Sequence, residues 1–239
     1  MSKKIILDCD PGHDDAVAIM LAAASDDIDL LGITCVGGNA TLENTKLNAL
    51  KVCSLIGRTD IKIYAGSNQP LKFDLVTAEH VHGQSGLDIE GDPIIVDENY
   101  NIEKLNAIDF IIKSCHEIED TIYLCPTGPL TNIALALQKD PAIKNKIQEI
   151  IFMGGAAMCL GNITPAAEFN IYVDPHAANI VLASGIPLTM MGLDVTHKVN
   201  VNEEIIRLIV SNNNKSSNFF ADLMKFYSRS HKQLYQMII

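Results

Sequence analysis

The sequence predicts an α/β fold with a mostly parallel, Rossmann-like layered sheet and helices on both faces. Short apolar runs of strand length alternate along the chain with longer stretches of helical period. This βα rhythm implies right-handed crossover connections, which join parallel strands. With 239 residues, of which 48% are hydrophobic, the chain is expected to form one large domain over residues 1–239.

Six apolar runs are the predicted strands. They lack the in/out alternation of a sheet with one wet face, so we expect helices to cover both faces. The predicted strands span residues 5–7, 30–36, 62–65, 121–125, 149–153 and 188–193.

The stretches between and after these strands have the apolar spacing of helices. Asn39 or Thr41 is predicted to cap the second helix, Thr131 the fourth, and Asp174 with Pro175 the fifth. Residues 66–100 form the longest irregular stretch, and loops of this length are usually functional or mobile. The predicted helices span residues 16–24, 41–56, 104–115, 131–138, 175–183, 202–210 and 217–239.

Composition argues against several classes of partner and location. A formal charge of −11 disfavours binding to nucleic acid, and no run approaches the ~20 apolar residues that a membrane helix needs. Asp8 and Asp10 interrupt the first apolar run, so we expect no secretion signal. The six cysteines lack metal-binding spacing and are interpreted as buried free thiols of a cytoplasmic protein.

The stretch "KKIILDCDPGHDDAVAIMLA" places four aspartates within eight positions, after the first predicted strand. Asp8 and Asp10 share a face of that strand, and Asp14 and Asp15 lie near the start of the next helix. Capping alone would account for the latter two. The clustering of four carboxylates favours a second interpretation, in which they bind a hard cation such as Ca²⁺ or Mg²⁺ through oxygen ligands. His13 is interpreted as a solvated or hydrogen-bonded side chain rather than a ligand.

Short polar residues and glycines also follow the other predicted strands. Ligands of open parallel sheets bind at the carboxyl ends of strands, so these residues are informative, and Asn39, Asn162, Glu168 and Asn170 are candidates for a pocket that accepts hydroxyl groups. Taken singly, each of these four is equally well explained as a turn or capping residue. The group comprises Gly37, Gly38, Asn39, Thr127, Gly128, Gly154, Gly155, Asn162, Glu168 and Asn170.

Seven motifs occur in order along almost the whole chain: "DCDPGHDDAVAIMLA", "VGGN", "HVHGQSGLD", "PTGPLTNIA", "FMGG", "GNITPAAEFNIYVDPHAA" and "GLDVTH". Together they make the chain resemble the inosine-uridine preferring nucleoside hydrolase family. Such enzymes cleave the N-glycosidic bond of ribonucleosides to ribose and free base, so this resemblance implies that activity and that fold. It also implies a homo-oligomer, a tetramer or a dimer.

The resemblance also implies a role for each matching residue. Asp10, Asp15 and the main-chain carbonyl of Thr127 would hold Ca²⁺, and Asp10 would act as general base on water. Asp8 would be structural. The implied substrate contacts are Asp14 and Asn170 to ribose hydroxyls, Asn162 and Glu168 to the 5′-hydroxyl, Asn39 and Met153 around the ribose, and His82 toward the base.

Members of this family continue beyond the point that matches "QLYQMII", with a His-Asp-Pro motif that supplies another metal ligand and a histidine assisting purine departure. The present sequence does not contain that motif, so weaker metal binding and lower activity are expected. Three explanations stay open: a truncated or interrupted reading frame, a site completed by another chain, or a degenerate protein without turnover. Tyr227, His231 and Tyr235 share one helix face that would meet the base or pack on the core.

Two further functions are weighed against hydrolysis. One is a non-catalytic module that binds nucleosides or ribose on the same scaffold. The other is a phosphatase of the haloacid-dehalogenase type, because "DCDPG" places Asp8 where that class has a nucleophile. Pro11 and Gly12 follow where that class has Gly-Thr or a close variant, which disfavours the phosphatase.

Overall fold

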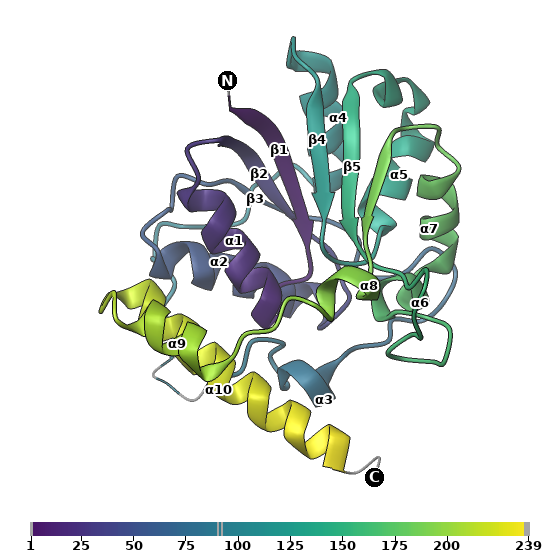
Figure 1. Cartoon of the computed structure of the whole chain (residues 1–239). Helices are drawn as coiled ribbons and strands as arrows, with labels where there is room; N and C mark the ends of the chain where they lie inside the picture. The colour runs from purple at the N-terminus through teal and green to yellow at the C-terminus, as the bar shows by residue number, and fades with distance from the viewer. Residues whose placement is uncertain (1, 90, 92, 237–239) are drawn as a thin grey trace.

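The computed structural model describes residues 2–89, 91 and 93–236, and side chains up to residue 229. In this part of the chain a six-stranded sheet has the order β3-β2-β1-β4-β5-β6, and each neighbouring pair is parallel (Figure 1). The predicted α/β class and parallel sheet are confirmed.

Every predicted strand overlaps a strand of the structure. The sixth is shorter than predicted, because the chain leaves the sheet at Gly192, which is the N-cap of a short helix. The strands are β1 Lys3–Cys9, β2 Ile28–Cys35, β3 Ile63–Ala65, β4 Ile122–Pro126, β5 Ile147–Met153 and β6 Leu188–Met191.

Among the described residues the seven predicted helices are present, and four short helices were not predicted. Residues 237–239, the end of the last predicted helix, lie outside the described residues. The predicted helices are α1 His13–Ala24, α2 Leu42–Leu55, α4 Ala107–Glu117, α5 Thr131–Lys139, α7 Pro175–Leu182, α9 Glu203–Val210 and α10 Lys215–Gln236. The short ones are α3 Glu79–His82, the 3₁₀ helix η1 Pro141–Asn145, α6 Phe169–Val173 and α8 Leu193–Thr196. Helices α3, α6 and α8 lie near the carboxyl ends of the strands (Figure 1).

Local hydrogen bonds explain where two helices begin. Helix α1 begins at His13, three residues before the predicted start, because Gly12 is its N-cap and donates its N–H to the Asp15 carboxylate (3.2 Å). Helix α4 begins three residues later than predicted, because the Asn106 side chain caps it by accepting from the Asp109 N–H (2.9 Å). Capping of this kind satisfies N–H groups that have no partner within the helix.

The three capping predictions differ in outcome. Asp174 caps α7, and Pro175 follows at the first helical position. Thr41 occupies the N-cap position of α2, but its side chain makes no capping bond. Thr131 lies inside α5 rather than before it, so that prediction is wrong. Its hydroxyl instead donates to Asp174 (2.8 Å), and this bond joins the starts of two helices.

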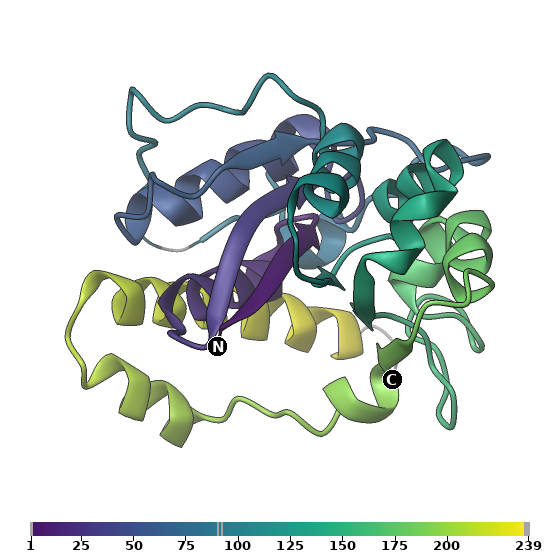
Figure 2. The ribbon, with the colours of Figure 1, turned by 90° about the horizontal axis from the view of Figure 1, so that it is seen from above.

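Two apolar cores lie on opposite faces of the sheet. Ile6 and Phe152 pack in the core covered by α4, α5 and α7, while Leu7 and Cys9 pack in the core covered by α1, α2 and α10. Figures 1 and 2 show α1 and α10 side by side on the second face. Successive residues of β1 therefore enter different cores, which explains its unbroken apolar run.

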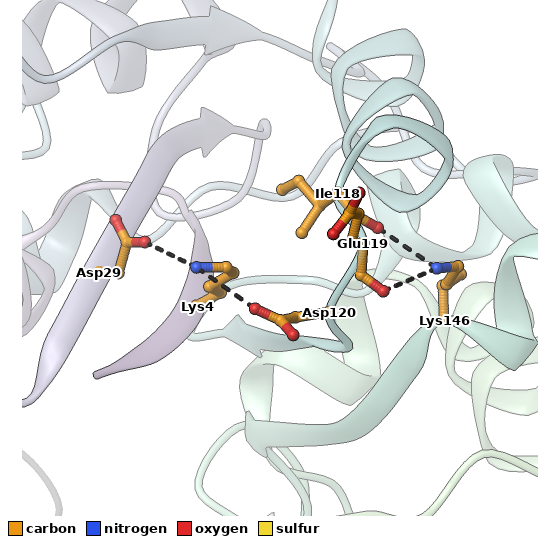
Figure 3. A network of polar contacts seen from close by, with 6 residues as sticks. All are labelled: Lys4, Asp29, Ile118, Glu119, Asp120 and Lys146. Atoms are coloured by element: carbon orange, nitrogen blue, oxygen red, sulfur yellow. Dashed lines mark hydrogen bonds and ion pairs between the residues drawn. The ribbon is translucent and has the colours of Figure 1, made fainter. Parts of the chain in front are cut away.

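The amino ends of the strands have polar contacts of their own, at the edge opposite the carboxyl ends (Figure 3). Lys4 Nζ lies 3.3 Å from Asp29 and 3.7 Å from Asp120, and Lys146 Nζ donates to the carbonyls of Ile118 (3.3 Å) and Glu119 (3.0 Å). Exposed ion pairs of this kind add little stability. Lys4 joins β1 to β2 and to the loop before β4, and Lys146 joins the loops before β4 and β5.

The cysteines are less uniformly buried than predicted. Four are buried, but Cys125 is half-buried and Cys159 lies exposed in the loop after β5. Within the described residues, none of the helices combines the length and the apolar character needed to cross a membrane.

Replacing Asp174 by Ala should lower the free energy of unfolding by about 2–4 kcal/mol. This fully buried carboxylate accepts from the N–H groups of Leu71 (2.8 Å) and Ala177 (2.9 Å) and from the Thr131 hydroxyl. The variant would leave all three donors without this acceptor. Urea unfolding measures the change, and Asp140→Ala, at the surface cap of η1, should cost much less. Equal losses in both variants would contradict this role of Asp174.

Candidate active site

The acidic cluster forms where the ends of β1 and β4 meet. These strands pair in parallel, with Asp8 opposite Pro126, so the loops that follow them lie side by side. Asp10 lies in the first loop, Asp15 in the first turn of α1, and Thr127 in the second loop. The Thr127 hydroxyl donates to Asp15 Oδ1 (2.5 Å). The structure thus brings the predicted metal ligands into one place.

The Asp10 carboxylate is fully buried and only half satisfied. Its Oδ2 accepts the Asn39 N–H (2.5 Å), whereas its Oδ1 has no hydrogen-bond donor among the described residues. Gly38 and Gly128 flank the carboxylate so closely that a Cβ on either would overlap one of its oxygens. The two glycines therefore form a cradle for Asp10, and the buried Oδ1 is available to a positive charge.

Mutual repulsion and burial raise the free energy of the ionised carboxylates in this cluster. Burial raises the pKa of Asp15 to about 7, and the charge of Asp14 adds to the rise. Burial, followed by the charge of Asp15, raises the pKa of Asp10. A bound cation would reverse both effects, because it favours the ionised carboxylates.

The donor atoms fit a hard cation. The ligand set would consist of the Asp10 and Asp15 carboxylates and the main-chain carbonyl of Thr127. That carbonyl accepts one hydrogen bond, from Asn170 Nδ2 (2.8 Å), and has a second lone pair for a cation. An all-oxygen set of this kind suits Ca²⁺ better than zinc. Among the residues that the structure describes, no three His, Cys, Asp or Glu side chains form a metal-binding group, so the set depends on the carbonyl.

Asp8 is a structural residue of the sheet. It is fully buried; its Oδ1 accepts from the Thr34 hydroxyl (2.6 Å) and from Asn132 Nδ2 (2.8 Å), and its Oδ2 has no donor among the described residues. Burial raises the pKa of Asp8 to about 7. A carboxylate enclosed in this way is not an accessible nucleophile, which argues against the phosphatase interpretation.

Three of the residues expected around the ribose are joined to Thr127 and to one another by hydrogen bonds. Asn170 Nδ2 donates to the carbonyls of Thr127 and Met153 (3.1 Å), while Glu168 caps α6 by accepting the N–H groups of Asn170 (2.9 Å) and Ile171 (3.3 Å). Glu168 also accepts the Gly155 N–H (2.9 Å), and burial raises its pKa. These bonds hold Asn170, Met153 and Glu168 beside the acidic cluster.

The remaining predicted ribose contacts differ in exposure. Asn39 is buried, and its Nδ2 donates to the Asp10 carbonyl (3.3 Å). Asp14 and Asn162 are exposed, and Asn162 Oδ1 accepts the Phe169 N–H (2.9 Å). Asp14 belongs to the same helical turn as Asp15, whereas Asn162 lies in the loop before α6.

Helix α3, within the long stretch of residues 66–100, places His82 close to the acidic cluster. His82 is buried, and its ring stacks on that of His13 with centroids 5.3 Å apart. A Cβ on Gly12 would lie 2.8 Å from the His82 ring. The half-buried Tyr227 from α10 lies near both histidine rings, with centroids 5.9 Å from His13 and 6.2 Å from His82. The side chains of His231 and Tyr235 lie outside the described residues.

The sequence did not reveal the contacts that two glycines and one asparagine make in the site. Gly38 and Gly128 belong to the quoted motifs "VGGN" and "PTGPLTNIA", yet their closeness to Asp10 depends on pairing between distant strands. Asn132 looks like an ordinary helix residue, but its amide donates to Asp8 and to the Cys35 carbonyl (3.0 Å) and accepts the Ser67 N–H (2.8 Å). A buried Asn in the first turn of an apolar helix was the available signal.

Comparison with known proteins gives consistent results along nearly the whole chain. Residues 5–238 match the family model described as inosine-uridine preferring nucleoside hydrolase. A pyrimidine-specific ribonucleoside hydrolase RihA from Photobacterium profundum is 46% identical over 232 residues, which are 97% of this chain and 74% of that protein. A RihA from Shewanella woodyi is 45% identical, over 97% of this chain and 73% of its own length.

Solved structures agree with the sequence comparison. A plant nucleoside hydrolase, PpNRh1, superposes with a TM-score of 0.92 at 34% identity, over 99% of this chain and 74% of that one. A purine-preferring ribonucleoside hydrolase from Gardnerella vaginalis superposes with a TM-score of 0.89 at 36% identity, over 97% and 74% of the two chains.

Proposed function

Because the chain belongs to the inosine-uridine preferring nucleoside hydrolase family, we propose that it hydrolyses the N-glycosidic bond of ribonucleosides in a Ca²⁺-dependent reaction. The products are ribose and a free base. The single observation that best supports the site is the buried Asp10 Oδ1, which has no donor among the described residues and lies in the glycine cradle.

In this proposal Asp10 is the general base. A Ca²⁺ ion held by Asp10, Asp15 and the Thr127 carbonyl would supply positive charge that orients water and the sugar diol. Asp10 removes a proton from the attacking water. As the bond to the base breaks, positive charge develops on the ribose, and the carboxylates around it favour that charge.

The neighbouring residues bind and orient the substrate. We assign Asp14 and Asn170 to the ribose hydroxyls, and Glu168 and Asn162 to the 5′-hydroxyl. Asn39 and Met153 shape the ribose pocket, and His82 meets the base. The bonds from Glu168 and Asn170 to the backbone keep these side chains in place before substrate arrives, which lowers the entropy cost of orientation.

The test is ribose release from uridine and inosine, with and without Ca²⁺. EDTA should abolish release, and added Ca²⁺ should restore it, since the carboxylates would lose the charge that lets them ionise together. Full activity in EDTA would contradict the metal site. Calorimetric binding of ribose with Ca²⁺ but without turnover would instead support the non-catalytic alternative.

We expect pyrimidine ribonucleosides to be better substrates than purine ones. The relatives named pyrimidine-specific are 45–46% identical to this chain, whereas the purine-preferring structure is 36% identical. The values of kcat/KM for uridine and cytidine should exceed that for inosine by about tenfold or more. Equal values, or a preference for inosine, would contradict this assignment.

We also propose a homo-oligomer, a dimer or a tetramer. Support comes from apolar side chains on one stretch of the surface: Val199 is 73% exposed and Leu208 70%, and no residue of α9 is buried. Light scattering should give a mass of two or four times 26.0 kDa. A single species at the monomer mass would contradict the proposal.

A cytoplasmic location is the final part of the proposal. The four buried cysteines occur as free thiols, which suits a reducing compartment. Cell fractionation of the native host would test this, and recovery of the protein only outside the cytoplasm would contradict it.

A further inference from the structure

His13 is held from two directions by one loop. Its Nε2 lies 2.8 Å from the Asp88 carbonyl oxygen, and its Nδ1 lies 3.0 Å from His82 Nδ1. The Asp88 N–H donates to the His82 carbonyl (3.2 Å), so both partners belong to one closed turn. Phe226 from α10 stacks on the His13 ring, with centroids 5.1 Å apart and the planes 8° from parallel. His13 is thus fixed by contacts with segments far away in the sequence.

The Asp88 carboxylate makes this turn rigid. It accepts the N–H groups of Gln84 (3.0 Å) and Ser85 (3.2 Å), and the Ser85 hydroxyl donates to it as well. Gly83 has a φ of +81° and lies against this carboxylate, where a side chain would be strained and would overlap it. The Asp88 carbonyl is therefore presented to His13 from a defined position.

For neutral rings, these distances determine where the protons lie. A carbonyl oxygen only accepts hydrogen bonds, so His13 Nε2 must carry a proton. In the neutral ring His13 Nδ1 is then an acceptor. The contact of 3.0 Å between the two Nδ1 atoms needs one proton, and that proton must come from His82.

The opposite assignment requires a buried cation. The His13 N–H lies 3.4 Å from His82 Nδ1 and would donate to it if that nitrogen carried no proton. His13 would then have to donate from both ring nitrogens and be an imidazolium. Its ring is fully buried, and its nitrogens contact an imidazole and a carbonyl. The charges of Asp14 and Asp88 favour the imidazolium, but among the described residues no carboxylate bonds to the ring, so they offset only part of the cost of burial. The 3.4 Å contact is also the longer one.

We propose that His13 is a positioning residue that holds His82 in the tautomer with its proton on Nδ1. In the neutral ring of this tautomer, His82 Nε2 acts only as a hydrogen-bond acceptor. When the ring becomes protonated, Nε2 is the atom that takes up the proton. The consequence of this tautomer for catalysis rests on the proposed function, in which His82 contacts the nucleobase. A neutral His82 would accept from an N–H of the nucleobase, and a protonated one would donate to it.

The tautomer can be read directly in the unaltered protein. The chain has seven histidines, so ¹⁵N-histidine labelling gives a small set of ring signals, and His→Gln variants assign them. At about pH 8, above the ordinary histidine pKa, two-bond ¹H–¹⁵N spectra should show His82 protonated on Nδ1 and His13 on Nε2. A His82 ring protonated on Nε2 alone would overturn the proposal, whatever the protein hydrolyses.

Variants of His13 then test the consequence. In His13→Phe the ring still stacks but offers no acceptor, so the His82 signal should shift toward the Nε2 tautomer and kcat/KM for uridine should fall about tenfold to a hundredfold. In His13→Gln one amide supplies both a donor and an acceptor, so the tautomer and most of the activity should return. The exposed His80, also in α3, gives the control His80→Gln, which should change neither.

The outcomes separate this inference from the proposed function. If no nucleoside is hydrolysed, the proposed function fails while the spectra still decide the tautomer. If uridine is hydrolysed and His13→Phe leaves the His82 tautomer unchanged, His13 is not the positioning residue.

Discussion

Replacing Asp10 by Asn should reduce uridine hydrolysis by about 10³-fold or more. The variant removes the proposed general base and one carboxylate of the cation site, while keeping the size of the side chain. The remaining Oδ atom can still accept the Asn39 N–H. Steady-state rates at saturating Ca²⁺ measure the loss.

The same variant should separate activity from stability. Without a cation, Asp10 is a buried carboxylate beside Asp15, so the neutral amide should leave the free energy of unfolding unchanged or higher. Added Ca²⁺ should stabilise the unaltered protein in thermal unfolding and should stabilise the variant much less. Asp26→Asn makes the same change at an exposed position and should alter neither property. An Asp10→Asn protein with a tenth or more of the activity would refute the general-base role.

Replacing either of the two glycines that flank the Asp10 carboxylate by Ala should have the second-largest effect on activity. In Gly38→Ala or Gly128→Ala the new Cβ would overlap an oxygen of the Asp10 carboxylate, which must then move. A displacement of about 1 Å can cost about 10²-fold in rate, so kcat/KM should fall by about that factor. Both glycines have φ values that other residues adopt, so the expected loss comes from the clash and not from the backbone.

Gly37→Ala is the matched control for this prediction. Its Cβ would meet nothing nearer than the Asn68 carbonyl oxygen at 3.1 Å, although it lies next to Gly38 in the same loop. We expect Gly37→Ala to lose less than about threefold in kcat/KM, whereas the Gly38 and Gly128 variants should also bind Ca²⁺ more weakly in calorimetry. Equal losses in all three variants would mean that the loops are sensitive to any added volume.

Local patterns in the sequence were sufficient for the sheet. Each predicted strand is present because a strand covered on both faces needs apolar residues at successive positions, and this requirement is visible within five or six residues. The Asp174 cap of α7 was equally visible, since its Asp-Pro signal involves neighbouring residues only.

Helix boundaries were less predictable where the first turn is polar. Helix α1 begins within the acidic loop rather than at the first apolar residue, because the Asp15 carboxylate accepts the Gly12 N–H. Thr131 has the composition of a cap, but it lies inside α5 and donates to Asp174, a residue 43 positions away. Capping chemistry and long-range bonding use the same side chains, and only the fold decides between them.

The sequence by itself determined the succession of strands and longer helices along the chain, the acidic loop at the end of the first strand, and the family. Only the tertiary structure decided the environment of each acid: Asp8 accepts from Asn132, 124 residues away, and the Asp10 carboxylate lies between two glycines, with an Oδ1 that has no donor among the described residues. Likewise, it alone placed His13 against His82, 69 residues away. The physical reason is that propensity and periodicity act over a few residues, whereas burial and hydrogen bonding depend on which distant segments the sheet brings together.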